Sequence, residues 1–183
     1  MNLITRYHQV TDHSGLNWCR EGNSWCRGVA ESHNLTLETV CAIVSALSPG
    51  TNWEQNKKDA LAVIERKTGY RCTTYGRNVA KARAILKDGV PGFSMKTGPK
   101  TYNFFHALLD PSATEHVVID RHACTIATGQ PYVGVRGEEY NLIAERYIRA
   151  SKKIGITPSE LQAVLWVDHR IKENIKFNIG TPF

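Results

Sequence analysis

Apolar side chains recur every three to four positions along most of the chain, the spacing that places them on one face of an α-helix. Residues 37–47 are typical: their apolar side chains share one face, Thr36 suits the N-cap, and Pro49-Gly50 breaks the pattern. Similar patterns predict further helices over residues 17–33, 52–67, 76–87, 98–109, 120–127, 138–154 and 157–174. The short apolar stretch 114–119 suits either a connector or a strand.

Capping residues support several of these boundaries. Thr157 and Glu160 form the two ends of a capping box, and Asn52 followed by Gln55 resembles another. The helix over 17–33 is the exception, because two internal glycines lower its helix propensity. With no internal repeat, low-complexity tract or long linker, the pattern predicts an all-α protein.

Length and composition narrow the class of protein. The 183 residues suffice for one domain with a sizeable core, so residues 1–183 are taken as a single domain. A hydrophobic content of 42% is too high for a disordered chain. Apolar runs such as 40–47 are far shorter than the ~20 residues of a membrane span. The N-terminus lacks an apolar leader and the five cysteines are an odd number, which favours a cytoplasmic protein with reduced thiols.

Positive charge is concentrated in one part of the chain. The formal net charge is +6, but residues 56–100 alone carry eleven Lys and Arg against three Asp and Glu. That segment is therefore +8 and the remainder is −2. A local basic zone indicates a polyanionic partner, with nucleic acid first, although a solvated helix face gives the same pattern.

The basic zone ends in two helices joined by a glycine-bearing turn. Residues 80–86 lie on the first helix, and Gly98, Pro99 and Lys100 lead into the second. Free amides at the start of a helix attract a phosphate, and glycine lets the backbone approach it closely. The pattern fits a hairpin that grips a nucleic-acid backbone, or an ordinary helical turn without a ligand.

Four segments form an ordered set of motifs. They are Val44-Ser45-Ala46-Leu47-Ser48-Pro49 with Trp53 and Asn56, then Asn78 to Ile85 with Lys81-Ala82, then Gly98-Pro99-Lys100-Thr101 with Asn103, then Val118-Ile119-Asp120-Arg121-His122. In order and spacing they resemble the "LSxQ…N", "KA", "GxKTAN" and "VDTH" segments of the helix-hairpin-helix base-excision DNA glycosylases, the endonuclease-III-like superfamily. The resemblance covers about residues 40–128. It implies a two-lobed helical fold, a hairpin at about 79–109 and an active site between the lobes.

The resemblance implies two catalytic residues. Asp120 occupies the position of the aspartate that promotes cleavage of the base–sugar bond, and a carboxylate there stabilises positive charge building on the sugar. Lys100 matches the lysine that, in bifunctional members, attacks C1′ as a Schiff-base nucleophile and drives β-elimination. The residues alone allow plainer roles, a helix N-cap for Asp120 and a phosphate contact for Lys100.

The resemblance also implies how the enzyme holds DNA and extrudes a base. The residues expected to contact DNA lie on the hairpin and the helix before it, namely Lys81, Lys96, Thr97, Gly98 and Thr101. An enzyme acting on a base must take it out of the stack. The residues expected near the wedge or the base pocket are Gly50, Asn52, Trp53 and Tyr102. The two aromatic residues also suit a hydrophobic core.

Departures from the family keep other functions open. The first hairpin glycine is replaced by Lys96 or deleted, and the last cysteine, Cys124, precedes the position of the family's iron–sulfur cluster. Cys19 and Cys26 with nearby histidines fit no standard zinc pattern, so we expect no metal or cofactor. The expected partner is double-stranded DNA, bound by a monomer associated with the nucleoid and not with a membrane. The alternatives are a phage-type enzyme of DNA base hypermodification and a non-catalytic DNA-binding module.

Overall fold

The computed structural model describes residues 2–89, 95, 98–131, 135 and 137–173, and within them the chain is helical with no strand. The predicted all-α class is confirmed for that part of the chain. Residues 114–120 form a connector without regular structure. The helices are α1 (Leu3–His8), the short 3-10 helix η1 (Ser14–Asn17), α2 (Trp18–Ser32), α3 (Leu37–Leu47), α4 (Trp53–Ile64), α5 (Gly76–Asp88), α6 (Pro99–Leu109), α7 (Arg121–Thr128), α8 (Glu138–Ile154) and α9 (Pro158–Lys172).

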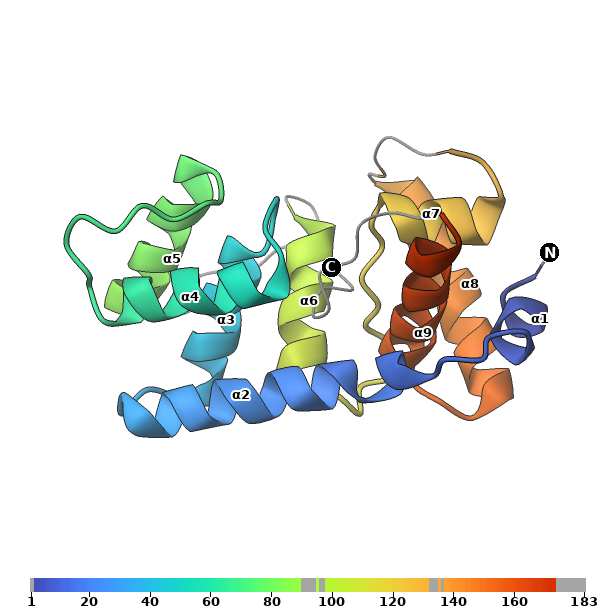
Figure 1. Ribbon diagram of the computed structural model, residues 1–183, viewed down its shortest axis with the longest axis horizontal. Coiled ribbons are helices and arrows are strands. Elements are labelled where there is room, and N and C mark those ends of the chain that lie inside the picture. The colour runs from blue at the N-terminus through green and yellow to red at the C-terminus, as the bar shows by residue number, and fades with distance from the viewer. Residues whose placement is uncertain (1, 90–94, 96–97, 132–134, 136, 174–183) are drawn as a thin grey trace.

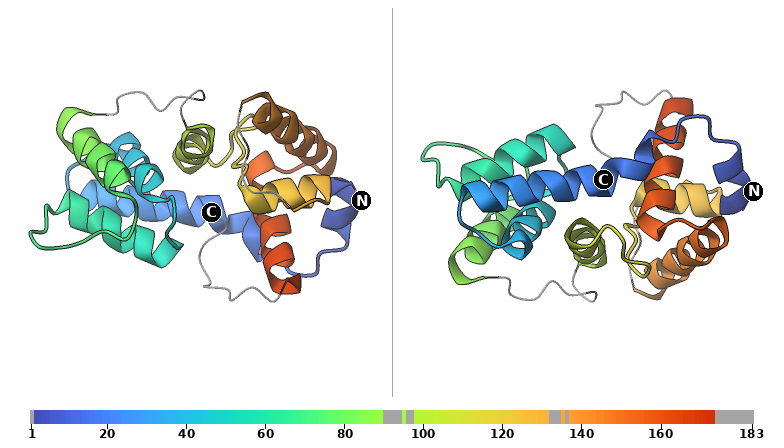
Figure 2. Two further views of the ribbon diagram at one scale, coloured as in Figure 1. Left: turned by 90° about the horizontal axis from the view of Figure 1, so that it is seen from above. Right: turned by 90° about the horizontal axis from the view of Figure 1, so that it is seen from below.

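The helices form two lobes, each built around its own hydrophobic cluster. The first cluster draws on α2 to α6, and the second on α1 and α7 to α9. Figure 1 shows the first lobe at the left, the second at the right, and α2 running beneath toward the junction. The two further views separate the same groups of helices (Figure 2). We use "first lobe" and "second lobe" in this sense below.

Helix α3 lies at the centre of the first lobe. No residue from Val40 to Leu47 is more than 2% exposed, and α3 packs against α2, α4, α5 and α6. A helix that is apolar on all sides requires burial on all sides, which α3 obtains at this position. The turn after α3 is held by the side-chain amide of Asn56, which donates to the carbonyl of Val44 at 3.2 Å.

Close backbone packing joins the first lobe to the second. A Cβ atom on Gly15 would lie 2.6 Å from the backbone nitrogen of Val164 in α9, so η1 contacts α9 directly. Gly22 has the same role within the first lobe, where a Cβ would meet Leu108 at 2.7 Å. Gly22, one of the two glycines that lower the helix propensity of this segment, therefore allows α2 to contact α6 closely.

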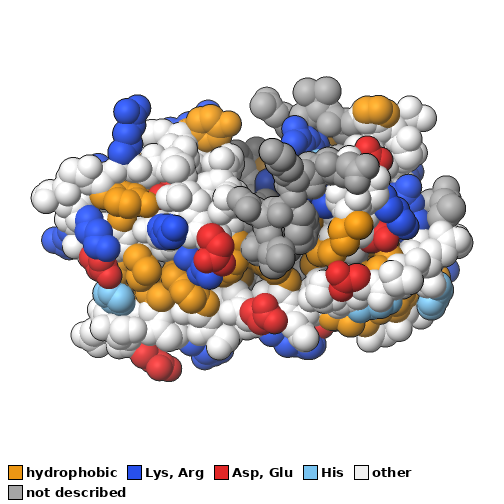
Figure 3. Space-filling model, viewed as in Figure 1, with side chains coloured by type: hydrophobic (Ala, Val, Ile, Leu, Met, Phe, Trp, Pro, Cys, Tyr) orange, Lys and Arg blue, Asp and Glu red, His pale blue; other side chains and the backbone are white. Residues whose placement is uncertain are grey.

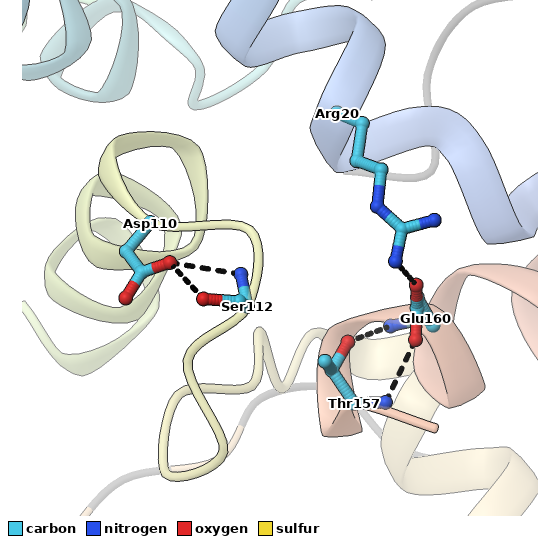
Figure 4. Close-up of polar contacts among 5 residues, drawn as sticks. All are labelled: Arg20, Asp110, Ser112, Thr157 and Glu160. Atoms are coloured by element: carbon cyan, nitrogen blue, oxygen red, sulfur yellow. Dashed lines mark hydrogen bonds and ion pairs between the residues drawn. The ribbon is translucent and has the colours of Figure 1, made fainter. Parts of the chain in front are cut away.

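A polar cluster reinforces the same junction. The Arg20 guanidinium pairs with the Glu160 carboxylate at 2.7 Å, and Glu160 is also the acceptor that completes the capping box of α9 (Figure 4). The predicted capping box is thus confirmed, and its carboxylate has a second partner on α2. In the same view, Asp110 accepts from the backbone and hydroxyl of Ser112 just after α6.

The predicted helix boundaries agree with the structure to within two residues, except at the end of α4. Helix α4 ends at Ile64 instead of residue 67, because Arg66 adopts a left-handed backbone with φ of 52°. The helix α1 and the 3-10 helix η1 were not predicted, since both are too short for a periodic pattern. No helix in the described ranges is long and apolar enough to cross a membrane.

Candidate functional site

A cleft with a volume of about 1170 Å³ lies between the lobes. The first lobe provides the turn after α3, one face of α5 and the start of α6. The second lobe provides the start of α7 and the C-terminal half of α9. The first-lobe lining includes Ser48, Pro49, Gly50, Thr51, Asn52, Arg77, Asn78, Lys81, Gly98, Pro99, Lys100 and Thr101; the second-lobe lining includes Ile119, Asp120, Arg121, His122, Tyr140, Trp166 and Arg170.

The described lining of the cleft is strongly basic. Its cations are Arg77, Lys81, Lys100, Arg121 and Arg170, and its one carboxylate is Asp120. Clefts lined by charge of one sign concentrate the field and attract ligands of the opposite sign. Lys and Arg side chains are also visible over the first lobe in Figure 3. The arrangement favours a polyanionic ligand.

Asp120 is held in a fixed orientation at the start of α7. One carboxylate oxygen, Oδ1, accepts from the backbone N–H of Ala123 at 2.8 Å as the N-cap of the helix. The other, Oδ2, accepts from the indole Nε1–H of Trp166 at 3.2 Å. The N-cap role predicted from sequence is confirmed, and the same side chain lines the cleft. The two interpretations of Asp120 are therefore compatible.

Two lysines lie in the same cleft as Asp120. Lys100 is in the first turn of α6, behind Pro99 at the first helical position. Lys81 is half-buried on α5, and burial lowers its pKa. A lower pKa leaves more of an amine uncharged and able to act as a nucleophile. The sequence indicated Lys81 only as a DNA contact, because its burial depends on packing between helices.

The buried hydroxyl of Tyr140 ties the segment before Asp120 to the helix that carries Lys100. It accepts from the backbone N–H of Ile119 at 3.1 Å and from the side-chain amide of Asn103 at 3.1 Å. It lies 2.9 Å from the carbonyl of Val117, to which it donates. Burial raises the pKa of Tyr140, which keeps the hydroxyl neutral. Sequence analysis matched Asn103 to a motif but had no signal for Tyr140.

Comparison with known proteins places the chain in one family. The family model described as "Family of unknown function (DUF7178)" matches residues 1–173. The chain belongs to the DUF7178 family. Neither the curated proteins nor the solved structures contain a match. The matched span includes both lobes and the whole described lining of the cleft, so the cleft lies within the DUF7178 domain.

Several predicted residues come together in the DUF7178 cleft. Gly50, Asn52, Gly98 and Thr101 all line it, as do the predicted cations discussed above. The side chain of Asn52 caps α4 by accepting from the backbone N–H of Gln55 at 2.9 Å. The Thr101 hydroxyl donates to the carbonyl of Gly98 at 3.1 Å, which shapes the entry to α6. Lys96 and Thr97 fall outside the described residues.

The prediction that Trp53 lies near the wedge or base pocket is not supported by its position. Its side chain is 9% exposed and packs edge-on against Trp18, with ring centroids 5.1 Å apart, and against Trp25 at 5.8 Å. It does not line the cleft of this DUF7178 chain. At the start of α4, the N-cap residue Asn52 lines the cleft, whereas the side chain of Trp53 packs on α2. The core interpretation of Trp53 is correct.

Tyr102 also points away from the cleft. Its ring packs against that of His106 at 4.4 Å and lies 5.8 Å from that of His116. Thr101 lines the cleft, and one residue further along α6 the helix has turned by about 100°. The ring of Tyr102 therefore belongs to an aromatic group with two histidines on another face of α6, and its stacking on a base stays a prediction.

Tyr75 is the exposed aromatic residue that sequence analysis missed. It is 60% exposed at the N-cap of α5, and a Cβ atom on Gly50 would lie 3.6 Å from its ring. The Thr74 hydroxyl donates to the carbonyl of Pro49 at 2.7 Å, which fixes this segment against the turn after α3. The Arg77 guanidinium lies 5.7 Å from the Tyr75 ring centroid. The ring therefore stands beside Gly50 at the rim of the cleft.

The described residues offer no evident metal centre. No group of three or more His, Cys, Asp or Glu within the described ranges is placed to hold a metal ion. The five cysteines are free thiols, and four of them are buried. The ionisable side chains that line the cleft are a carboxylate, two amines, guanidinium groups and the half-buried imidazole of His122, whose pKa burial lowers.

Proposed function

We propose that this DUF7178 protein is a DNA glycosylase, which extrudes a damaged or modified base from duplex DNA and cleaves its N-glycosidic bond. The observation that carries the proposal is a single oriented carboxylate, Asp120, in a cleft whose other charged lining residues, among those described, are Lys and Arg. The all-helical, two-lobed arrangement and the motif resemblance to helix-hairpin-helix glycosylases support it. In this proposal the cleft is the DNA site. Helices α5 and α6 of the first lobe flank the expected hairpin, but they pack mainly on α3 (Figure 1), and most of the turn between them lies outside the described residues.

The basic lining supports DNA as the partner. Arg77 and Lys81 on α5 and Lys100 on α6 lie on the first lobe, while Arg121 and Arg170 lie on the second. Phosphate contacts of this kind position DNA without reading its sequence. Binding that rests on them weakens steeply with added salt, because each neutralised phosphate releases counterions.

The carboxylate supports cleavage of the base–sugar bond. As the base departs with the bonding electron pair, positive charge develops on the sugar, and a nearby carboxylate stabilises that charge. Asp120 is fixed by hydrogen bonds to both oxygens, so its orientation does not depend on the ligand. Departure is completed when the base takes up a proton and water or an amine adds to C1′.

The amines support an associated strand-cleaving activity. An uncharged lysine adds to C1′ as the base leaves, ring opening gives an imine, and loss of a proton from C2′ expels the 3′-phosphate. Lys100 is the candidate from the motif resemblance. Lys81 is the candidate from the structure, because burial lowers its pKa.

One observation favours a second candidate, a non-catalytic DNA-binding module. Both oxygens of Asp120 already accept hydrogen bonds within the protein, as an ordinary capping residue would. A module of this kind binds duplex DNA as tightly as an enzyme but releases no base. The basic cleft supports both candidates equally, so a chemical assay is required to distinguish them.

The decisive experiment measures base release. Duplex DNAs carrying oxidised, alkylated, deaminated or hypermodified bases are incubated with the protein, and free bases are identified by mass spectrometry. Release of one class of base supports the glycosylase and names its substrate. A base altered in mass but still attached to the DNA, detected after digestion of the duplex to nucleosides, with no base released favours the hypermodification alternative. Binding of every duplex with no base released or altered identifies the non-catalytic module.

A further inference from the structure

A second cavity, with a volume of about 600 Å³, lies within the first lobe. The end of α4, the loop after it and the later turns of α5 form its walls. None of its lining residues lines the cleft. The volume lies in the range of ~300–1,000 Å³ that is usual for small-molecule sites.

The lining combines an apolar floor with a basic rim. Ala62, Val63 and Leu86 provide apolar surface, and the rim cations are Arg66, Lys67, Arg83 and Lys87. No carboxylate belongs to the lining as described. Apolar and basic side chains are visible together where α4 and α5 lie in Figure 3. Such a lining suits a ligand that has both an apolar body and a negative charge.

The four rim cations are not equivalent. Lys67 pairs with Glu65 at 2.8 Å, and Lys87 lies 3.9 Å from Asp88. Arg66 and Arg83 form no ion pair with any described residue. A guanidinium presents donors in a planar fork that matches the oxygens of a phosphate. The two arginines are therefore the groups best suited to bind the charged end of a ligand.

The wall of the cavity is fixed by a buried carboxylate. Asp59 has no exposed surface, and its oxygens accept from the Tyr70 hydroxyl at 2.9 Å and the Gln55 amide at 2.8 Å. They also accept from the backbone N–H and hydroxyl of Thr73, each at 2.9 Å. These bonds hold the loop that includes Tyr70 and Cys72 against α4. A wall held in this way is formed before a ligand binds, which reduces the entropy lost on binding.

We propose that this cavity binds a small organic phosphate monoester, with its apolar body on Ala62, Val63 and Leu86 and its phosphate at Arg66 and Arg83. The site is independent of the proposed DNA cleft. Helix α5 serves both, since Arg77 and Lys81 face the cleft while Arg83 and Lys87 face the cavity. A nucleoside monophosphate and an alkyl phosphate both satisfy this description.

Isothermal titration calorimetry on the full chain tests the ligand chemistry. The probes are thymidine 5′-monophosphate, hexyl phosphate, thymidine and inorganic phosphate. We expect saturable binding of at least one organic phosphate, with inorganic phosphate and thymidine each weaker by about tenfold or more, because each lacks one half of the interaction. Absence of binding by both organic phosphates, or equal binding of inorganic phosphate, overturns the proposal.

Exposed arginines allow a matched test of location. Arg83→Gln removes a rim charge on α5. Arg71→Gln removes a charge from the loop between α4 and α5, outside the lining, and Arg121→Gln removes one from the cleft. We expect about a tenfold or greater loss of affinity only in Arg83→Gln, the size of one charge-assisted hydrogen bond. Loss in Arg121→Gln with no loss in Arg83→Gln places the phosphate in the cleft and contradicts the proposal.

Cys72 provides an independent readout. It is the only one of the five cysteines that is not buried, and it belongs to the lining. Partial burial of Cys72 raises the pKa of its thiol, so alkylation is followed under mildly alkaline conditions by mass spectrometry. A bound organic phosphate is expected to slow alkylation of Cys72, and duplex DNA is not. An unchanged alkylation rate at saturating phosphate ester rules out binding in this cavity.

Discussion

The two lobes face the same cleft but contribute different chemistry to it. The first lobe presents Arg77, Lys81 and Lys100 together with a turn that contains Gly50. The second lobe presents a carboxylate, Asp120, held between the N-terminus of α7 and the indole of Trp166 on α9. One side of the cleft is thus mainly suited to contact phosphates, and the other carries the group proposed to act on the sugar.

This division teaches that binding and bond cleavage are separable in the proposed enzyme. A change at Arg77 on the first lobe is expected to alter affinity for DNA, whereas a change at Asp120 is expected to alter the rate of base release. The two candidate nucleophiles, Lys81 and Lys100, also lie on the first lobe and are tested separately below. The basic side chains Arg121 and Arg170 qualify the division, because they add positive charge to the second lobe. The following predictions test the contrast, from the largest expected effect to the smallest.

The largest effect is expected from Asp120→Asn. Asparagine is an equally good N-cap for α7. The substitution removes the negative charge that stabilises the sugar cation and also the hydrogen bond from the Trp166 indole, so folding is checked by circular dichroism. We expect base release to fall by about 100-fold or more while DNA affinity, measured by electrophoretic mobility shift, changes little. Asp168→Asn is the matched control, because that aspartate on α9 pairs with Lys172 and does not line the cleft. Unchanged base release in Asp120→Asn contradicts the catalytic assignment.

Borohydride trapping distinguishes the two first-lobe amines. Reduction of an imine between lysine and the sugar gives a covalent protein–DNA adduct, and the modified residue is mapped by mass spectrometry. We expect the adduct to disappear in either Lys100→Ala or Lys81→Ala, with Lys81 favoured by the lowered pKa that burial gives it. Retention of the adduct in both variants assigns the attack to another group. Base release without any adduct makes the enzyme monofunctional.

Tyr75 tests whether the rim of the first lobe contacts bases. Stacking of a base on an aromatic ring contributes about 1–3 kcal/mol, so Tyr75→Ala is expected to weaken DNA binding by about tenfold. Tyr75→Phe keeps the ring and should retain most of the affinity. Both are measured by fluorescence anisotropy with a labelled duplex. Equal loss of affinity in the two variants indicates that the hydroxyl, and not the ring face, is what matters.

Tyr140→Phe tests the connection between the lobes. The change leaves the Ile119 N–H without its acceptor, which we expect to lower the free energy of unfolding by about 1–3 kcal/mol. Tyr147→Phe is the comparison within the second lobe, where the buried hydroxyl donates to one carbonyl, that of Ala123, at 3.0 Å. Chemical denaturation should show the smaller loss for Tyr147→Phe. A larger loss of unfolding free energy in Tyr147→Phe contradicts the role of the Tyr140 hydroxyl as the polar connection between the lobes.

The smallest effect concerns pH. The rings of His106 on α6 and His116 in the connector that follows it stack at 4.3 Å, and burial lowers the pKa of both below the usual 6.5. The unfolded chain therefore takes up protons more readily, so their contribution to stability is present above about pH 6.5 and is lost as pH falls through the folded pKa values. We expect the melting temperature to fall on mild acidification, and less so in His106→Gln. An unchanged pH dependence in that variant assigns the effect to His122 and His169 of the second lobe, whose pKa values burial also lowers.

Sequence was sufficient for the helices and their caps because those depend on neighbours along the chain. Thr36, Asn52, Asp120 and Thr157 all accept at the helix starts where the pattern placed them. Helix α3 shows the limit of this information. Its periodicity indicated one apolar face, whereas the structure buries every side from Val40 to Leu47, since α3 packs against four other helices.

The cleft was harder to predict because it depends on contacts distant in sequence. Trp53 and Tyr102 were plausible base-stacking residues by type, but the rotation of α4 and α6 against their neighbours turns both away from the cleft. Tyr75 and Tyr140 had no motif to mark them, and their roles arise from Gly50 and Ile119 in other segments. Residue type indicated the chemistry available, and packing decided which residues face the cleft.

The hydrogen bonds of the Tyr140 hydroxyl influence whether the protein or the DNA changes shape when the two bind. The hydroxyl joins the segment before Asp120 to α6, so the spacing of the two walls is set within the protein before any nucleic acid arrives. A duplex that enters a cleft of fixed width must itself bend or unstack, at an energy that depends on local sequence and damage. The stiffness of the DNA, and not only the shape of one base, would then contribute to the choice of site.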